Sequence, residues 1–363
     1  MDEGQIRPVR KAPAPPAESF EFEGVSVAPG TRRTVDVPLG VLSNHTPINM
    51  SVQVVHGRRA GPTVFVSAAI HGDEVIGVEI VRRLLSGLDA SKLRGTLLAV
   101  PIVNAFGFLA HSRYLPDRRD LNRCFPGFEN GSLASRLAHL FMRTIVSRCR
   151  LGIDLHSAAI HRTNLPQLRL SPVNDETRTL AEAFGAPVIL PAGLRDGSLR
   201  AAAREVGIDV LLYEAGEGLR FDETAVRAGT TGILRVLRAL DMLPARGAGV
   251  PTRKGPPTVH ALSSRWTRAP EAGLVRIYRD IGEIVAAGDV LGIVADPFGE
   301  REHEVHAPEA GIIIGRATMP VVNAGDALFH IARIENENAA AEAVEGMEDR
   351  LDTDPFYDED EII

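Results

Sequence analysis

Short apolar runs that are too short for buried helices recur along the first two thirds of this 363-residue chain, and they constrain its fold most strongly. These runs are rich in β-branched residues and occupy residues 63–70, 97–103, 152–155 and 210–213. Continuous apolar strands of this kind are typical of a sheet that is covered on both faces.

Segments with helical periodicity lie between and after these runs, at residues 75–88, 132–145 and 222–240. Ser132 stands at a position where it can cap the second of them. Strands that alternate with amphipathic helices predict an α/β domain with a largely parallel or mixed sheet flanked by helices.

Composition indicates an ordinary globular protein, with 44% apolar and 24% charged residues. The net charge of -7 argues against a nucleic-acid partner. Two cysteines are too few for a disulfide framework, and no apolar run approaches the roughly 20 residues of a membrane span. The polar N-terminus also lacks the apolar core of a secretory signal. We therefore expect a cytoplasmic protein with no membrane partner.

The chain divides by composition into five parts. Residues 1–18, which are Pro-rich, and residues 336–363, which are acidic, are predicted to be disordered. Residues 19–244 form a first domain with a strand-rich start and an α/β core. Residues 245–257, rich in Gly, Pro and Arg, are predicted to be a linker. Residues 258–335 form a second domain.

The second domain contains an internal repeat. Ala-Pro-Glu-Ala-Gly occurs at 269–273 and again at 307–311, and a Gly-Asp turn recurs near 288 and 325. Two such halves predict a small, barrel-like β-sandwich with pseudo-twofold symmetry. The block resembles biotinyl/lipoyl carrier domains, but no lysine follows Lys254 to carry a prosthetic group. We therefore expect a structural or substrate-shielding module.

Candidate metal ligands stand at the ends of two apolar runs. His71 and Glu74 follow the run 63–70, and their spacing lets one helical turn aim both side chains at one point. His156 ends another run, two residues after Asp154 on the same face of a strand. Two imidazoles and one carboxylate, with a position left for water, form a common zinc site. The alternative for His156 is a hydrogen-bonded core histidine.

Further polar residues are suited to catalysis and to substrate binding. Glu214 ends the run 210–213 before a Gly-rich turn, so its carboxylate can accept a proton from a metal-bound water, with Glu217 as a local competitor. Asn122 and Arg123 lie on an irregular segment and combine a neutral donor with a planar fork that suits a carboxylate. A solvated charged loop is the alternative for that segment.

These motifs together resemble the succinylglutamate desuccinylase/aspartoacylase family, a branch of the zinc carboxypeptidase fold. The motifs are His71-Gly72-Asp73-Glu74, Asp120-Leu121-Asn122-Arg123, Asp154-x-His156 and Glu214-x-Gly216, in this order. The resemblance makes residues 19–244 the zinc hydrolase domain. The second domain also resembles that of the family.

The resemblance implies a role for each matching residue. His71, Glu74 and His156 would bind one Zn²⁺ per subunit, and Glu214 would be the general base. Asn122 and Arg123 would hold the substrate's carboxylate. Asp120 would orient the first zinc-binding histidine, and Arg113 would stabilise the oxyanion of the tetrahedral intermediate.

The implied activity is zinc-dependent hydrolysis of a linear amide, which removes an acyl group from a small N-acyl amino acid by attack of the zinc-bound water. One alternative is a metallocarboxypeptidase, which would need an open groove for peptides. Another is a non-catalytic binding protein, against which the intact catalytic set argues. The acyl group, the amino acid and the oligomeric state, homo-oligomers included, stay open at this point.

Overall fold

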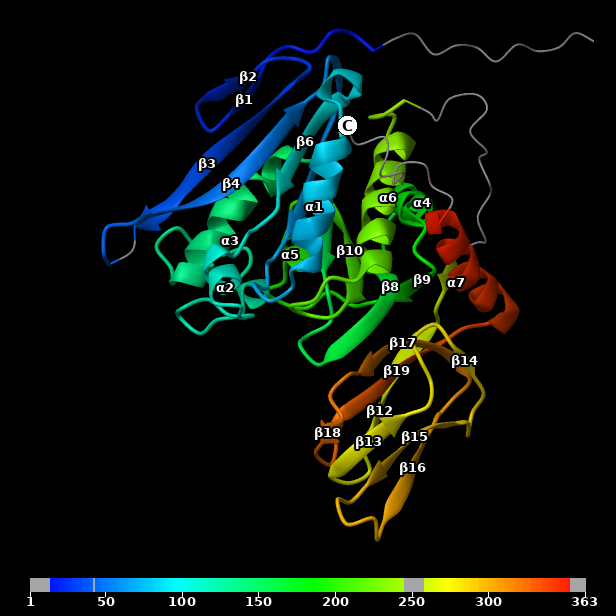
Figure 1. The fold of residues 1–363 in the computed structure, drawn as a ribbon. Coiled ribbons are helices and arrows are strands. Elements are labelled where there is room, and N and C mark those ends of the chain that lie inside the picture. Colours follow the sequence, from blue (N-terminus) through cyan, green and yellow to red (C-terminus); the bar gives the residue numbers. More distant parts are fainter. Residues whose placement is uncertain (1–13, 42, 245–257, 353–363) are drawn as a thin grey trace, which may run out of the picture.

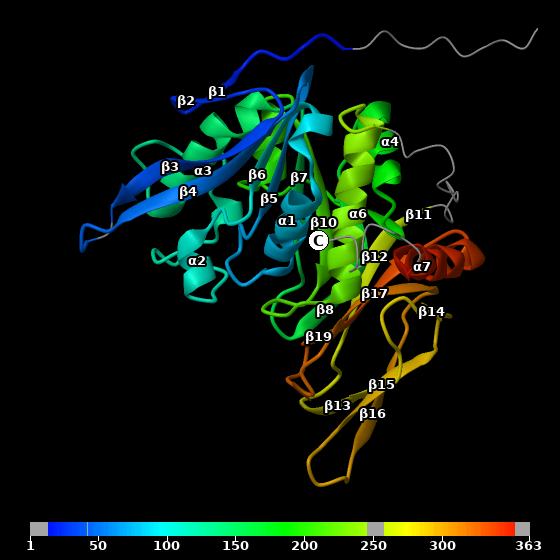
Figure 2. The same ribbon diagram turned by 45° about the horizontal axis from the view of Figure 1, so that its top comes forward.

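The computed structural model describes residues 14–41, 43–244 and 258–352, drawn in Figures 1 and 2. A large mixed sheet runs through the molecule in the order β12-β19-β17-β8-β10-β7-β5-β6-β4-β3. Its central strands are parallel to one another: β10 (Asp209–Gly216), β7 (Leu151–His156), β5 (Arg59–Ala68) and β6 (Arg94–Val100). The predicted α/β class with a mixed sheet and flanking helices is confirmed.

Antiparallel strands extend this core on both sides. On one side lie β4 (Pro47–His56) and β3 (Thr31–Val41), and on the other lies β8 (Arg162–Leu170), which also pairs in parallel with β9 (Val188–Pro191). Strands β1 (Phe20–Phe22) and β2 (Val25–Val27) form a separate hairpin. All of β7 is buried, whereas the middle of β3 alternates between buried and exposed, because only the central strands are covered on both faces.

Helices cover both faces of the central sheet (Figure 2). On one face α1 (Ile76–Gly87), α4 (Asp175–Phe184) and α6 (Glu223–Ala239) share a core with alternate residues of β5. The opposite face packs on α3 (Leu133–Thr144) and α5 (Leu199–Glu205). The short elements are α2 (Ala105–Leu109), η1 (Ala90–Lys92), η2 (Leu121–Arg123) and η3 (Val146–Arg148). Within the described ranges, none of the helices is long and apolar enough to cross a membrane.

The helices that the periodicity predicted are present, with ends that differ by a residue at most from the expected ones. Ser132 caps α3, because its hydroxyl accepts a hydrogen bond from the backbone N–H of Ser135. Asp222 caps α6 in the same way. These side chains satisfy backbone donors that have no partner within the helix.

The C-terminal repeat forms two sheets. One has the order β16 (Glu302–His306), β15 (Val290–Ala295), β13 (Gly273–Ile277) and β18 (Val321–Val322). The second consists of β12 (Ser263–Arg268), β19 (Ala327–Arg333), β17 (Gly311–Ala317) and β14 (Ile284–Val285). The two copies interlock, since Ala269 exchanges backbone hydrogen bonds with the turn at Gly325 and Ala307 does so with the turn at Gly288. Apolar side chains of both sheets form one core.

The second of these sheets continues the central sheet. Strand β17 pairs with β8, with Gly315 opposite Asn164, and β11 (Val259–His260) pairs with β9. We call residues 258–352 the C-terminal half and the described residues before them the α/β half. Backbone hydrogen bonds join the two halves, which nothing in the sequence predicts. The division into domains and the likeness to carrier domains stay predictions, and the linker at 245–257 lies outside the described residues.

The expectation of a disordered acidic tail is wrong for residues 337–352, which form α7 (Glu337–Asp352). Ala340 and Ala343 are buried against C-terminal strands, and Met347 and Leu351 are buried against the α/β core. The high average acidity conceals this apolar stripe, whose members lie on one face of a helix. Residues 353–363 lie outside the described ranges.

The predicted disordered arm at 1–18 is also partly ordered. Ala17 donates a hydrogen bond to the carbonyl of Arg58, and Ala60 donates one to the carbonyl of Pro15. Residues 14–18 thus lie along the start of β5, while residues 1–13 lie outside the described ranges.

The position of α7 can be tested by Ala343→Asp. Ala343 is 1% exposed, so the substitution buries a charge without a partner and should lower the free energy of unfolding by at least about 2 kcal/mol in urea titration. Asn338→Asp adds the same charge at an exposed position of α7 and should change stability little. Equal stability of the two variants would contradict the packing of α7.

Candidate active site

The sequence-predicted site residues gather at the carboxyl end of the central strands. His71 follows β5, and His156 is the last residue of β7. Glu214 lies on β10 directly opposite His156 in the parallel register. Gly72 shapes the turn that carries His71, because a Cβ there would lie 1.9 Å from the backbone carbon of Gly107 in α2.

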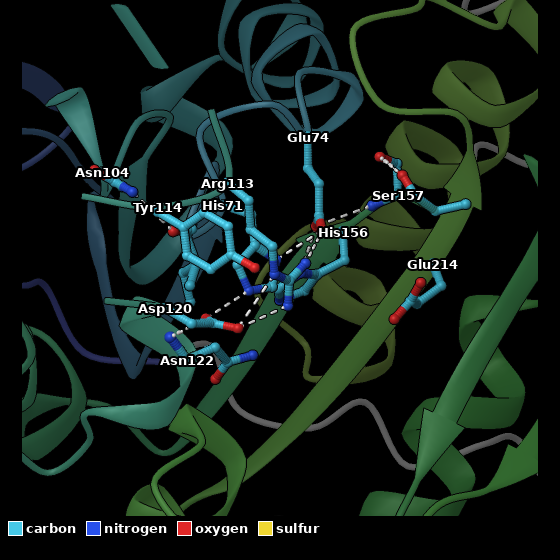
Figure 3. Close-up of polar contacts among 12 residues, drawn as sticks. His71, Glu74, Asn104, Arg113, Tyr114, Asp120, Asn122, His156, Ser157 and Glu214 are labelled. Carbon is cyan, nitrogen blue, oxygen red and sulfur yellow. Dashed lines mark hydrogen bonds and ion pairs between the residues drawn. The ribbon is translucent and has the colours of Figure 1, made fainter. Parts of the chain in front are cut away.

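His71, Glu74 and His156 converge on one buried point, and their ligand atoms lie within 4.8 Å of one another. Nδ1 of His71 is 2.7 Å from one carboxylate oxygen of Glu74, and Nδ1 of His156 is 2.6 Å from the other. The backbone N–H of Ser157 also donates to Glu74. Figure 3 shows the three side chains pointing toward one another.

A further carboxylate contacts the Nε2 atom of each imidazole, on the side away from Glu74. Asp120 Oδ1 lies 3.1 Å from Nε2 of His71, and Asp154 Oδ2 lies 2.8 Å from Nε2 of His156. Ser67 in turn donates to the second oxygen of Asp154. A proton on each Nε2 leaves the Nδ1 lone pair directed at the centre of the cluster, as in many metal sites. Asp154 shares a strand face with His156, as the sequence predicts, and its contact with Nε2 of His156 is the role that the structure adds.

The electrostatics of the cluster favour a positive charge at its centre. Burial disfavours protonation of His71 and His156, yet the neighbouring carboxylates outweigh burial and raise the pKa of both imidazoles, that of His156 most of all. Burial alone would raise the pKa of Glu74, but the two imidazoles hold it well below its usual range. The field that retains these protons would equally stabilise a bound cation, and two imidazoles with one carboxylate suit zinc.

Arg113 lies beside this cluster. Its guanidinium contacts Glu74 Oε1 at 3.2 Å and Asp120 Oδ2 at 2.9 Å. Burial opposes its charge, but Glu74 and then Asp120 raise the pKa of Arg113. When both imidazoles are neutral, as metal ligands must be, a single guanidinium offsets only part of the negative charge of Glu74, Asp120 and Asp154. The excess of negative charge in that state matches a divalent cation.

Glu214 lies apart from the cluster, beyond His156, while Asp120 and Asn122 lie on the other side (Figure 3). The amide of Asn164 donates to Glu214 Oε2 at 3.0 Å, and Arg169 lies 3.4 Å from Oε1. Both partners come from β8, and neither belongs to a sequence motif that would predict this role.

Asp120 also shapes the segment that carries Asn122 and Arg123, since its carboxylate caps η2 by accepting from the N–H of Asn122. The side-chain oxygen of Asn122 accepts from the N–H of Leu199 at the start of α5, which leaves its NH₂ group to face a ligand. The guanidinium of Arg123 donates to the carbonyl of Asn122 at 2.6 Å. Both side chains line the cleft described next.

A cleft of about 310 Å³ contains these groups. It brings together His71, Glu74, His156, Glu214, Asn122 and six arginines, namely Arg113, Arg123, Arg162, Arg169, Arg195 and Arg200. Trp266 from β12 also lines it, so the C-terminal half contributes to its wall. Positive charge therefore predominates away from the carboxylates of the cluster.

Glu217, the local competitor of Glu214, and Arg204, an arginine of α5, do not take part in the cleft. Glu217 accepts hydrogen bonds from the N–H of His161 and the hydroxyl of Thr318, so its carboxylate fixes a turn. Arg204 donates to the carbonyl of Pro172 and pairs with Asp209. Neither is among the residues that line the cleft.

The fold and the site define the class of protein: an α/β protein with a candidate metal site at the carboxyl end of its parallel strands. The model of the succinylglutamate desuccinylase/aspartoacylase catalytic domain matches residues 60–240. The chain belongs to this family.

Relatives cover most of the chain. N-alpha-acetyl-L-2,4-diaminobutyric acid deacetylase of Halomonas elongata is 26% identical over 338 residues, which are 90% of this chain and 98% of that protein. Succinylglutamate desuccinylase of Burkholderia pseudomallei is 30% identical over 63% of this chain and 64% of its own length. The product-bound structure of the ectoine utilization protein EutE (DoeB) from Ruegeria pomeroyi has 25% identity and a TM-score of 0.73, over 83% of this chain and 95% of that one.

Asp154→Asn tests how far Asp154 supports the candidate metal site through its contact with His156. The amide keeps the shape of the carboxylate but removes its charge, so zinc affinity should fall about 10- to 100-fold in a competition titration with a chelating dye. Asp36→Asn, at an exposed position of β3, should leave the affinity unchanged. Equal affinities for both variants would remove Asp154 from the site.

Gly315→Ala tests the support of Glu214 from the C-terminal half. A Cβ at Gly315 would lie 2.7 Å from the side-chain oxygen of Asn164, so the amide that holds Glu214 must move. We expect turnover to fall roughly tenfold or more while the fold is kept. Gly193→Ala meets no atom within 4 Å and is the matched control. Unchanged turnover in Gly315→Ala would contradict this coupling.

Proposed function

We propose that this chain is a zinc-dependent deacylase of small N-acyl amino acids. The observation that carries the proposal is the composition of one cleft, where a His-Glu-His cluster, a separate carboxylate and several carboxylate-binding groups line about 310 Å³. The deacetylase and the desuccinylase named above act on N-acyl derivatives of different amino acids. The part their substrates share is an N-acyl group on an amino acid, and this is what we propose for the present chain.

The size of the cleft favours a small amide over a peptide. Its volume lies at the lower end of the range for small-molecule sites, which is about 300–1,000 Å³. Trp266 from the C-terminal half forms part of its wall, as expected of a shielding module. A metallocarboxypeptidase would need a groove that continues past this wall.

The residues of the chain divide the work of amide hydrolysis. His71, Glu74 and His156 would hold Zn²⁺, and Asp120 and Asp154 would fix the two imidazoles. When bound, Zn²⁺ lowers the pKa of a coordinated water and polarises a carbonyl group.

Glu214 would accept a proton from the attacking water and deliver it to the leaving amine. Asn164 and Arg169 aim its carboxylate by holding both of its oxygens. Arg113 would stabilise the negative charge that develops on the acyl oxygen. Asn122 and Arg123 would bind the amino-acid carboxylate, so that the amide is oriented before attack.

The test is metal analysis of the purified protein, followed by a screen of N-acetyl and N-succinyl amino acids against short peptides. We expect one zinc ion per chain, hydrolysis of at least one N-acyl amino acid, and loss of activity on chelation that zinc restores. Efficient cleavage of peptides alone, or full activity after complete removal of metal, would contradict the proposal.

Glu214→Gln separates catalysis from metal binding. The variant should keep its zinc and lose roughly 10²- to 10⁴-fold in kcat, because the amide cannot accept the proton. Glu217→Gln is the matched control, since that carboxylate lies outside the cleft. Wild-type activity in Glu214→Gln would remove this residue from the mechanism.

A further inference from the structure

Trp266 is the only tryptophan of the chain, and it lines the cleft from a strand of the C-terminal half. Its indole stacks on the imidazole of His330, with ring centres 4.6 Å apart and planes 11° apart. The two residues are directly opposite each other on β12 and β19. The guanidinium carbon of Arg162, at the start of β8, lies over the indole at 5.4 Å from the ring centre. We call Arg162, Trp266 and His330 the stacked wall.

The histidine of the stacked wall is a neutral support. Burial, with a smaller effect of Arg169, lowers the pKa of His330 to about 4. Nε2 of His330 lies 2.8 Å from the hydroxyl of Ser264, which fixes the ring. The indole therefore rests on an uncharged ring, and Arg162 is the cation of the stacked wall.

Arg162 differs from most of the other arginines in the cleft. Arg113 and Arg169 pair with carboxylates of the site. Arg123 and Arg200 donate to backbone carbonyls. Among the residues that the structure describes, no carboxylate forms an ion pair with Arg162.

The stacked arrangement leaves the binding edge of Arg162 available. A guanidinium that lies on an aromatic ring uses its face, so its N–H groups stay free along the edge. This edge matches a carboxylate with two parallel hydrogen bonds. The indole also restricts the long side chain to one region, which reduces the entropy lost on binding.

The position of Arg162 separates it from the proposed clamp for the amino-acid carboxylate. Arg162 precedes Asn164 by two residues on β8, and Asn164 binds Glu214. Residues two apart on a strand share a face, so Arg162 lies on the Glu214 side of the cleft. Asn122 lies on the other side of the cluster (Figure 3).

We propose that Arg162, positioned by Trp266, binds a second carboxylate of the substrate and thereby selects dianionic N-acyl amino acids. This inference rests on the proposed function. The second carboxylate can end the acyl chain or belong to the side chain of the amino acid, and both sources offer the same group to Arg162. Trp266 acts as a positioning residue through which the C-terminal half controls specificity.

The first test uses the fluorescence of Trp266 in the zinc-loaded full chain. Acetate against succinate and glutarate probes the acyl source, and alanine against aspartate and glutamate probes the side-chain source, all at constant ionic strength. In at least one of the two series, the dicarboxylate should change the emission at a concentration at least tenfold lower than its monocarboxylate partner.

Arg162→Gln should abolish this discrimination while it keeps the fluorophore. Arg265→Gln is the matched control, because Arg265 is the exposed neighbour of Trp266 on β12 and points to the opposite face of the sheet. Equal discrimination in Arg162→Gln and the wild-type chain, or no discrimination in the wild-type chain, would overturn the proposal.

The second test uses kinetics with matched substrates that differ only in the second carboxylate. Arg162→Gln should raise KM for the dianionic substrate roughly 10- to 100-fold with little change in kcat, and should leave the monoanionic substrate unaffected. Trp266→Ala should produce most of the same loss although Arg162 is present, and Trp266→Phe should restore part of it. Equal losses for both substrates would mean a structural role only.

The two tests separate this inference from the proposed function. Suppose that the fluorescence titration distinguishes dicarboxylates from monocarboxylates only when Arg162 is present, and that no amide is hydrolysed. This result would support the binding of a second carboxylate by Arg162 and contradict the proposed deacylation. Deacylation with no effect of Arg162→Gln on the choice of substrate would support the proposed function and contradict this inference.

Discussion

The buried carboxylate of Glu74 is the interaction on which the site depends. It is 3% exposed, and its two oxygens face the imidazoles of His71 and His156. A buried carboxylate is stable only when charged or hydrogen-bonding partners surround it. The central strands end at the same edge and so supply those partners. The fold thus concentrates carboxylates where the strands end, and this arrangement favours a bound cation.

The residues that hold the candidate ligands and Glu214 in place come from distant parts of the chain. Asp120 from the irregular segment and Asp154 from β7 hold the imidazoles, whereas Asn164 from β8 holds Glu214. Strand β8 is itself paired with a strand of the C-terminal half, opposite Gly315. The candidate metal ligands therefore belong to the α/β half alone, but the setting of the proposed base depends on both halves.

Local patterns in the sequence predicted the elements and residues that lie at strand ends. The apolar runs and the helical segments between them predict the α/β class and three of the helices. The polar residues that follow two of these runs predict that His71 and His156 lie close together. Asn164 and Arg162 could not be predicted, because at these positions β8 pairs only with strands that lie more than forty residues away along the chain. Helix α7 is not evident from composition, because its acidic residues outnumber the few apolar side chains that form its buried face.

The pairing of β17 with β8 has a consequence for any shortened form of the protein. Residues 162–164 of β8 have β17 as their outer neighbour, whereas residues 167–170 have β9. A chain cut before the C-terminal half would keep every candidate metal ligand, yet residues 162–164 of β8 would lose their outer pairing partner. Such an open edge invites pairing with other chains. The α/β half would therefore expose an edge that the C-terminal half covers in the full chain.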